Sequence, residues 1–252
     1  MRVLALDTTT ADGSVAIVND EGVLIERLGD RTRSHTERLP NDLMTALAAV
    51  GVTLRDVDLF AIVAGPGSFT GLRTGIATMQ GLALVGGKPM VAVSAVDVLC
   101  TAASIDAPPG GIVGAWMDAH RREVFSALYR VGEGSPYDPE SLTEVEAATV
   151  GEPLTTLARW QANDVVPSVL AGDGATLYGD LAGRVTRVMP HPLLAPIAGR
   201  MAIARAARGL AVPPTLVLPI YVRRPDVEVT RDARRAADSA ALRVASGQAS
   251  ET

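Results

Sequence analysis

Hydrophobic and polar residues follow two different periods along this chain, and their alternation predicts an α/β protein. Residues 59–63 are apolar throughout, which is typical of a strand buried on both faces of a parallel sheet. The Asn, Asp and Gly residues between 14–18 and 23–28 predict two strands joined by a tight turn. The strands expected in the first half are residues 3–6, 14–18, 23–28, 59–63 and 90–93.

Three helices are expected between and after these strands. Ser34 and Glu37 match a capping box, and they open a helix that extends to about residue 50. Pro40 has no N–H for the preceding turn, so this helix either kinks there or begins nearer that residue. A second helix is expected over residues 70–85 and a third from Ser94. The resulting order, β-β-β-α-β-α-β, is that of an α/β fold.

The second half of the sequence repeats this order of elements. A predicted strand over residues 112–117 is followed by Asp118, as residues 3–6 are followed by Asp7, and the segment AGDGATLYGDLAG resembles AGPGSFTGLRTG. Asp7 precedes Gly65 by 58 positions, and Asp118 precedes Gly172 by 54. We therefore expect two similar halves, each with a strand, a glycine loop and a helix at equivalent places.

The remaining segments of the second half are less regular. Further strands are expected at residues 124–129 and 166–170, further helices at about 154–160 and 195–210, and an extended stretch between prolines at 213–225. Residues 130–165 otherwise have little periodicity. From residue 230 the chain lacks aromatic side chains and is rich in Ala, Arg, Asp and Ser. These patterns predict a first lobe over residues 1–105, a second and smaller lobe with C-terminal elements over 106–229, and a flexible tail over 230–252.

Composition and charge limit the classes of function. The 252 residues are 48% hydrophobic and 20% charged, with a formal net charge of −5, which is typical of a globular protein without a dominant basic surface. A role with RNA is therefore expected to depend on a partner. The single cysteine, Cys100, excludes an internal disulfide and is typical of a reducing compartment. We recognise neither a secretory signal nor a bilayer-spanning run, so we expect no membrane association and a cytoplasmic protein.

The glycine loop over residues 65–71 has the layout of a phosphate-binding site, but it lacks the residues that such sites use. Backbone N–H groups at a helix N-terminus attract anions, yet the loop has neither the closing Gly-Lys-Ser/Thr nor a G-x-G-x-x-G spacing. A sharp strand-to-helix turn explains its glycines equally well. Asp7 has two open interpretations, a ligand of Mg²⁺-phosphate or a cap of its turn. We expect at most a weak nucleotide or anion site, formed by Asp7, Thr8, Gly65 and Gly67.

Small residues form a strip on the helix that follows the loop. Gly71 and Gly75 lie four apart on one face and Thr78 continues the strip. Each glycine inside a helix costs on the order of 0.5–1 kcal/mol relative to alanine, so close approach of another element is expected to offset the cost. That element lies either within the chain or across a subunit boundary, and the sequence leaves both open.

Residue spacing favours neither a metal site nor a catalytic nucleophile. His35, His120 and His191 have no metal-ligand spacing. We expect His35 to be a solvent-facing residue of a first helical turn, His120 to lie in a hairpin turn and His191 in a loop. Ser68 has no identifiable base. The residues from Asp118 to Glu123 are either a polar cluster between the two halves or charges paired around a turn.

Four motifs of the sequence resemble a known family. LALDTTTADGSVAI, AGPGSFTGLRTGIATMQGLA, DAHRREVFSALY and PIYVR are similar to segments of the bacterial TsaB family, also called YeaZ, which acts in tRNA threonylcarbamoyladenosine biosynthesis. The glycine loop with its helix is the most specific of the four. This chain departs from the common family pattern, Asp-Ala-Arg followed by a tyrosine, at His120 and Phe125.

The resemblance implies a duplicated actin-like ATPase fold (ASKHA, as in Hsp70 and the sugar kinases) with a reduced second lobe. It also implies a non-catalytic subunit that binds and activates a TsaD-type transferase, works with a TsaE-type ATPase, and reaches tRNA only through that complex. The modified nucleoside is the adenosine beside the anticodon of ANN-decoding tRNAs. In the family, pairing uses the two helices of the first lobe, and the same helices form a homodimer when TsaD is absent.

The residues expected at this interface follow from the two helices. They are Leu39, Leu43, Gly71, Leu72, Gly75, Ile76, Thr78 and Met79. No catalytic residue, metal or firmly bound cofactor is expected, and ATP or ADP is expected to bind weakly if at all. The alternative function is a small ATP-dependent phosphotransferase of the same fold, with Asp7 on Mg²⁺ and the two glycine loops on phosphates.

Overall fold

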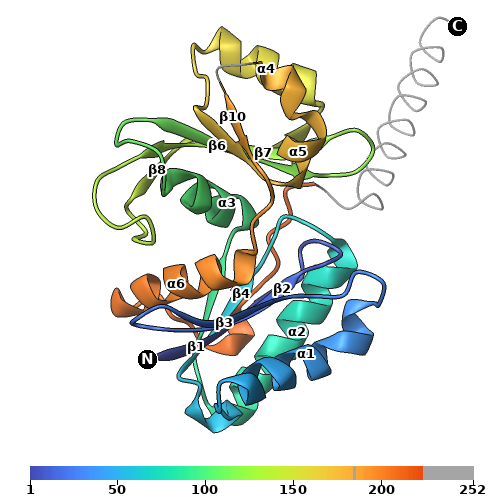
Figure 1. The fold of residues 1–252 in the computed structure, drawn as a ribbon, viewed down its shortest axis with the longest axis vertical. Helices are drawn as coiled ribbons and strands as arrows, with labels where there is room; N and C mark the ends of the chain where they lie inside the picture. The colour runs from blue at the N-terminus through green and yellow to red at the C-terminus, as the bar shows by residue number, and fades with distance from the viewer. Residues whose placement is uncertain (184–185, 224–252) are drawn as a thin grey trace, which may run out of the picture. The chain divides into compact units, whose positions relative to one another are not determined.

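The computed structural model describes residues 1–183 and 186–223. The chain divides into two compact units, Met1–Ile220 and Tyr221–Thr252, and the fold below is that of the first unit (Figure 1). The tail predicted over residues 230–252 lies outside the described residues, so that prediction stays open.

The first sheet contains five strands in the order β3-β2-β1-β4-β5. β1 pairs with β2 in antiparallel and with β4 in parallel orientation, and β5 continues the parallel side. Asn19 closes the hairpin between β2 and β3, because its side-chain oxygen accepts hydrogen bonds from the N–H groups of Glu21 and Gly22. The strands are β1 (Arg2–Asp7), β2 (Ser14–Asn19), β3 (Val23–Leu28), β4 (Leu59–Val63) and β5 (Met90–Val93).

Helices α1 (His35–Ala49) and α2 (Phe69–Gly86) cover one face of this sheet (Figure 1). The predicted capping box of Ser34 and Glu37 is present at the start of α1. Because α1 begins at His35 and runs through Pro40, the alternative of a start near Pro40 is wrong. α2 begins after Ser68, whose hydroxyl accepts from the Gly71 N–H, and ends at Gly87 in the left-handed conformation.

The second sheet has the same topology as the first, which confirms the predicted duplication. Its order, β10-β9-β6-β7-β8, places β6, β7, β8, β9 and β10 where the first sheet has β1, β2, β3, β4 and β5, with the same parallel and antiparallel pairs. Two α/β halves of this kind form the actin-like fold. The second half has a counterpart for each strand of the first sheet, but β9 and β10 have three residues each, where β4 has five and β5 has four. The strands are β6 (Ile112–Asp118), β7 (Val124–Val131), β8 (Leu142–Gly151), β9 (Val169–Ala171) and β10 (Arg187–Met189).

Two helices pack on the sheet of the other half. α3 follows β5 in sequence but contacts β6, β7 and β9, whereas α6 follows β10 but covers β1, β2, β4 and β5. The packing therefore does not follow the boundary at residue 105 that the sequence suggests. The helices of this part are α3 (Ala95–Ser104), α4 (Pro153–Ala162), α5 (Asp173–Tyr178) and α6 (Leu194–Ala207), with short 3-10 turns η1 (Leu54–Asp56), η2 (Gly179–Ala182) and η3 (Pro214–Leu216).

Two strands of the second sheet differ from expectation. β8 lies within residues 130–165, where little regular structure is predicted, and β10 is not predicted at all. β8 is an edge strand that pairs with β7 and none of its residues is fully buried, so it has no run of buried apolar residues to mark it. The stretch over 213–225, expected to be extended, contains the 3-10 turn η3.

Candidate functional site

The loop after β1 places a buried carboxylate at the centre of the first half. Asp7 is 2% exposed, and its Oδ1 accepts hydrogen bonds from the N–H and the hydroxyl of Thr9 at 2.8 and 2.7 Å. Burial raises the pKa of Asp7 above its ordinary value, although the Thr9 hydrogen bonds and the nearby His191 and His35 favour the ionised form. Such a buried acid costs stability at neutral pH, so it is a candidate functional residue.

The glycine loop packs directly on this turn. The Ser68 N–H donates to the Thr9 carbonyl at 2.7 Å, and a Cβ atom at Gly67 would come against Thr9. Gly65, at a φ of +117°, has the Ile220 carbonyl where a side chain would start. The four residues expected to bind a nucleotide or anion are therefore close together in the fold. The two glycines among them are explained by close packing against other segments of the same chain.

The small-residue strip on α2 is filled by the same loop. A Cβ atom at Gly71 would overlap the Thr8 carbonyl oxygen, and one at Gly75 would overlap the Thr8 hydroxyl. Thr8 itself is fully buried. The intramolecular alternative for the strip is therefore the one found, and Gly71 and Gly75 do not form a ridge for a second subunit.

Most of the other expected interface residues are also covered by their own chain. Leu39, Leu43, Ile76 and Met79 pack in the core between α1, α2 and the first sheet. Leu72 is also buried, and its side chain lies beside Gly65 of the glycine loop. Thr78 is half-buried and its hydroxyl donates to the Thr74 carbonyl at 2.8 Å. These residues were expected at a subunit interface because helical spacing identifies the apolar side of each helix. In the structure, that side faces the protein's own sheet.

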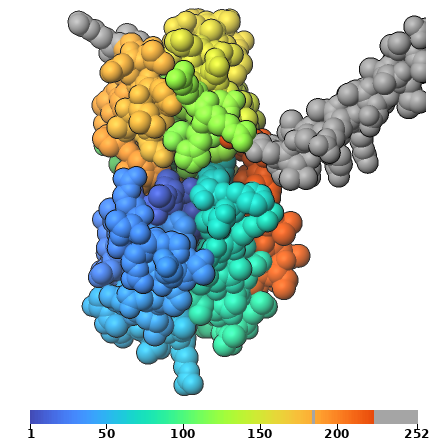
Figure 2. Space-filling model, turned by 90° about the vertical axis from the view of Figure 1, so that its right-hand side faces the viewer, coloured from blue at the N-terminus to red at the C-terminus, as the bar shows by residue number. Residues whose placement is uncertain are grey.

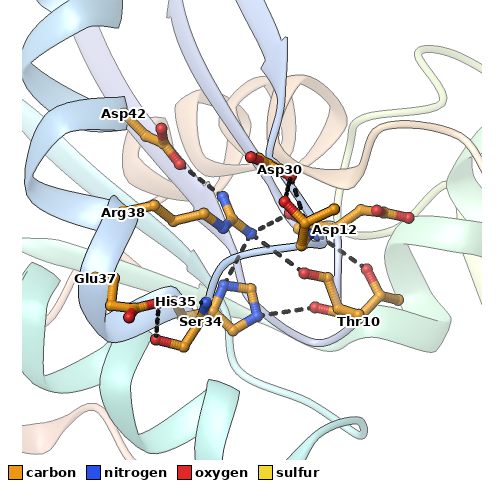
Figure 3. A network of polar contacts seen from close by, with 11 residues as sticks. Thr10, Asp12, Asp30, Ser34, His35, Glu37, Arg38 and Asp42 are labelled. Carbon is orange, nitrogen blue, oxygen red and sulfur yellow. Dashed lines mark hydrogen bonds and ion pairs between the residues drawn. The ribbon is translucent and has the colours of Figure 1, made fainter.

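A polar network around Arg38 ties α1 to the loop after β1 (Figure 3). Arg38 is 2% exposed; it pairs with Asp42 at 2.6 Å and donates to the Ala11 and Asp12 carbonyls. Its guanidinium lies where a side chain at Gly29 would begin. Arg38 is not among the residues expected from the sequence. The signal for its burial is a basic residue next to Leu39 on the apolar side of the helix, four positions before Asp42.

His35 belongs to this network and is not the solvent-facing residue that the sequence suggests (Figure 3). Its Nε2 lies 2.9 Å from the Thr10 carbonyl and its Nδ1 lies 2.9 Å from the Arg38 guanidinium. Because Arg38 can only donate, Nδ1 accepts and Nε2 carries the proton. Partial burial and the neighbouring Arg38 lower the pKa of His35, which keeps the ring neutral.

The equivalent turn of the second half is more open. The Asp118 carboxylate accepts from the His120 N–H at 2.9 Å, while the Asp118 N–H donates to the Asp173 carboxylate at 2.9 Å. His120 is exposed in the hairpin turn, as expected, and has a positive φ with its two successors, Arg121 and Arg122. His191 lies in a loop with its Nδ1 3.9 Å from Asp173.

α1 and α2 lie side by side on one face of the first sheet (Figure 2), and several apolar side chains on them are exposed. Val85 is 92% exposed and Leu84 55%, and Gly81, one turn earlier, has open space where a side chain would start. The exposed side chains of this surface, which we call the α1–α2 face, are Met44, Phe69, Arg73, Ala77, Leu84 and Val85.

Within residues 1–183 and 186–223, no three His, Cys, Asp or Glu side chains are grouped as metal ligands would be. No helix there has the length and apolar character needed to cross a membrane.

Comparison with known proteins gives consistent results. A family model described as TsaD, tRNA N6-adenosine threonylcarbamoyltransferase, matches residues 29–161. The tRNA threonylcarbamoyladenosine biosynthesis protein TsaB of Escherichia coli (strain K12) is 34% identical over 171 residues, which cover 64% of this chain and 73% of that protein. An uncharacterized protein of Mycobacterium tuberculosis is 31% identical over 231 residues, which cover 90% of this chain and 93% of that protein. The structure of YeaZ from Pseudomonas aeruginosa superposes with a TM-score of 0.70 at 29% identity, covering 87% of this chain and 99% of its own. The chain belongs to the family that the TsaD model describes and, within it, to the TsaB (YeaZ) group.

Proposed function

We propose that this chain is a non-catalytic subunit in tRNA threonylcarbamoyladenosine biosynthesis, and that it binds and activates a TsaD-type transferase. The similarity to the biosynthesis protein TsaB supports the pathway, and the match to the TsaD model over residues 29–161 supports a related subunit as partner. The threonylcarbamoyl transfer to adenosine is then carried out by the partner, with a TsaE-type ATPase in the assembled complex.

The observation that carries the proposal is the exposed α1–α2 face. Met44, Phe69, Leu84 and Val85 are each at least 45% exposed on these two helices, and exposed apolar surface marks contact sites in soluble proteins. Ala77 and Gly81 add a shallow strip between Arg73 and Leu84, where the backbone of a partner helix can approach α2 closely. The proposed contact therefore uses the outer sides of the two helices, not the buried residues that the sequence analysis selected.

A pull-down with matched leucine variants tests this contact. Leu84→Glu places a charge on the α1–α2 face, and Leu154→Glu places the same charge on α4, where the leucine is 64% exposed. We expect Leu84→Glu to reduce recovery of the purified TsaD-type partner at least tenfold, because a buried unpaired carboxylate is costly, and Leu154→Glu to leave it unchanged. Equal recovery of both variants would argue against this surface.

The pathway is tested separately from the contact. Depletion of the protein, followed by mass spectrometry of tRNA nucleosides, is expected to reduce threonylcarbamoyladenosine. Complementation with Leu154→Glu is expected to restore it, and complementation with Leu84→Glu is not. Calorimetry with Mg-ATP on the isolated chain addresses the enzyme alternative, since tight binding with turnover would contradict a non-catalytic subunit.

A further inference from the structure

The exchange of α3 and α6 brings a carboxylate of one half between groups of both sheets. Asp97 lies on α3, which packs on the second sheet, and α3 also contacts α6, which covers the first sheet. The Tyr129 hydroxyl, from β7, donates to Asp97 Oδ1 at 2.6 Å. Arg205, from α6, lies 3.4 Å from Asp97 Oδ2. Asp97 therefore links the second sheet to the helix that covers the first.

Arg205 also bonds to the first sheet itself. Its second guanidinium nitrogen donates to the Ala92 carbonyl of β5 at 3.0 Å. Both charged side chains are about three-quarters buried, so solvent screens this pair less than it screens an exposed pair. Burial and the neighbouring Asp97 raise the pKa of Tyr129, so its hydroxyl stays protonated and remains a donor.

Two further arginines, Arg200 of α6 and its C-cap residue Arg208, reach the turn between β7 and β8. Arg208 pairs with Asp138 at 2.7 Å and with Glu140 at 2.6 Å. The guanidinium of Arg200 stacks over the Tyr137 ring at 4.8 Å. These contacts are more exposed than the Asp97 cluster, and we expect each to contribute less.

We infer that Asp97, Tyr129 and Arg205, supported by Arg200 and Arg208, form a clasp that fixes the second sheet relative to the first, so that the two halves move as one rigid body. The geometry carries this inference: one carboxylate accepts from a strand of the second sheet and from the helix that covers the first sheet. The cations of the contact come from α6 and its C-cap residue, Arg208. The clasp concerns this chain alone and does not depend on the proposed function.

Spin-label distance measurements test the clasp. Labels on Ala48→Cys in α1 and Ala162→Cys in α4 report the separation of the two sheets, since both positions are exposed. Cys100 is buried and burial raises its thiol pKa, so the labels go to the introduced cysteines. We expect one narrow distance distribution in the otherwise unchanged chain. Tyr129→Phe with Arg205→Ala is expected to broaden it at least twofold, or to shift its maximum.

Arg159→Ala is the matched control, because Arg159 pairs with Glu146 inside the second half. It is expected to leave the distribution unchanged. Tyr129→Phe alone removes one hydroxyl from a buried ring, so it tests the clasp even if the double variant does not fold. We expect it to broaden the distance distribution less than the double variant does. A broad distribution in the starting protein, or an unchanged one in a folded clasp variant, would overturn the inference.

Discussion

The two halves of the chain place an aspartate at the end of the first strand of each sheet, but they surround it differently. Asp7 is enclosed by Thr8, Thr9 and the glycine loop, whereas Asp118 lies beside an exposed hairpin turn. In both halves, glycines let the following helix approach that strand end. Gly172 and Gly174 lie against the backbone of Trp116 and Met117 as Gly71 and Gly75 lie against Thr8.

The difference lies mainly in what supports each loop. In the first half, Arg38 and His35 of α1 hold the loop after β1 (Figure 3), and α2 extends over 18 residues. In the second half, the helix after the glycines, α5, has six residues, and the turn is stabilised by Asp118 and Asp173. The same topology has therefore become a rigid, buried corner in one half and an open turn in the other.

The largest effect is expected where the first half differs most, at Arg38. Arg38→Ala removes a buried cation that pairs with Asp42 and donates to two backbone carbonyls. Breaking a buried pair while leaving its partners unpaired costs about 3–5 kcal/mol. Arg159→Ala removes a more exposed ion pair of the second half, and we expect a loss of about 1 kcal/mol or less. Urea denaturation of both variants measures the difference, and equal losses would mean that the Arg38 network does not hold the first half together.

A smaller effect is expected for the packing of Thr8 against α2. Gly75→Ala forces a methyl group onto the Thr8 side chain, and overpacking of this kind costs about 1–3 kcal/mol. Gly81→Ala adds the same methyl group on the open side of the helix, and we expect it to stabilise the chain by about 0.5–1 kcal/mol. Thermal or urea unfolding compares the two variants.

A double-mutant cycle separates this contact from helix propensity. Thr8→Ala removes the hydroxyl and methyl groups that a Cβ at position 75 would meet. The combined variant is therefore expected to lose less stability than the sum of the single variants. Additive losses would show that the strain at Gly75 arises elsewhere.

Much of the fold could be predicted because buried strands have a clear pattern. The runs at Leu59–Val63 and Met90–Val93 are apolar and were placed at their observed bounds. β8 could not be placed, since an exposed edge strand has no such pattern. The exchange of α3 and α6 was also beyond sequence reasoning, because an apolar stripe shows that a helix is covered but not which sheet covers it.

The candidate site shows the same limit. Spacing identified Gly71 and Gly75 as one close-contact face, but it could not tell a partner subunit from Thr8, which is 63 positions away from Gly71 in sequence. Arg38 could not be predicted because a buried arginine needs room, and that room comes from Gly29, which lies outside the helix. Local pattern predicts which faces are buried, and distant residues decide what buries them.

The smallest effect, and the most specific to the enclosed aspartate, is expected from Asp7→Asn. Both hydrogen bonds from Thr9 go to Oδ1, and an asparagine oxygen can accept them as well. Burial raises the pKa of Asp7 above its ordinary 3.8. Between pH 3.8 and that raised pKa, the folded chain therefore holds a proton that the unfolded chain has lost. Stability from this group is then greatest below 3.8 and is lost as pH rises through the folded pKa.

We therefore expect Asp7→Asn to melt at a higher temperature than the unchanged chain at pH 7.5, and the difference to shrink as pH falls toward 4. His35 acts in the opposite direction, because its lowered pKa reduces the stability of the fold as pH falls below 6.5. His35 is present in both proteins, so its effect largely cancels when their melting temperatures are compared. Asp118→Asn, at the equivalent and partly exposed position, is the control and is expected to change the melting temperature little at pH 7.5, because an amide oxygen can still accept from the His120 N–H. Scanning calorimetry between pH 4 and pH 7.5 measures these melting temperatures. A variant at position 7 that is less stable at pH 7.5 would mean that the ionised carboxylate is stabilised by its surroundings, and the two aspartates would then differ in exposure but not in role.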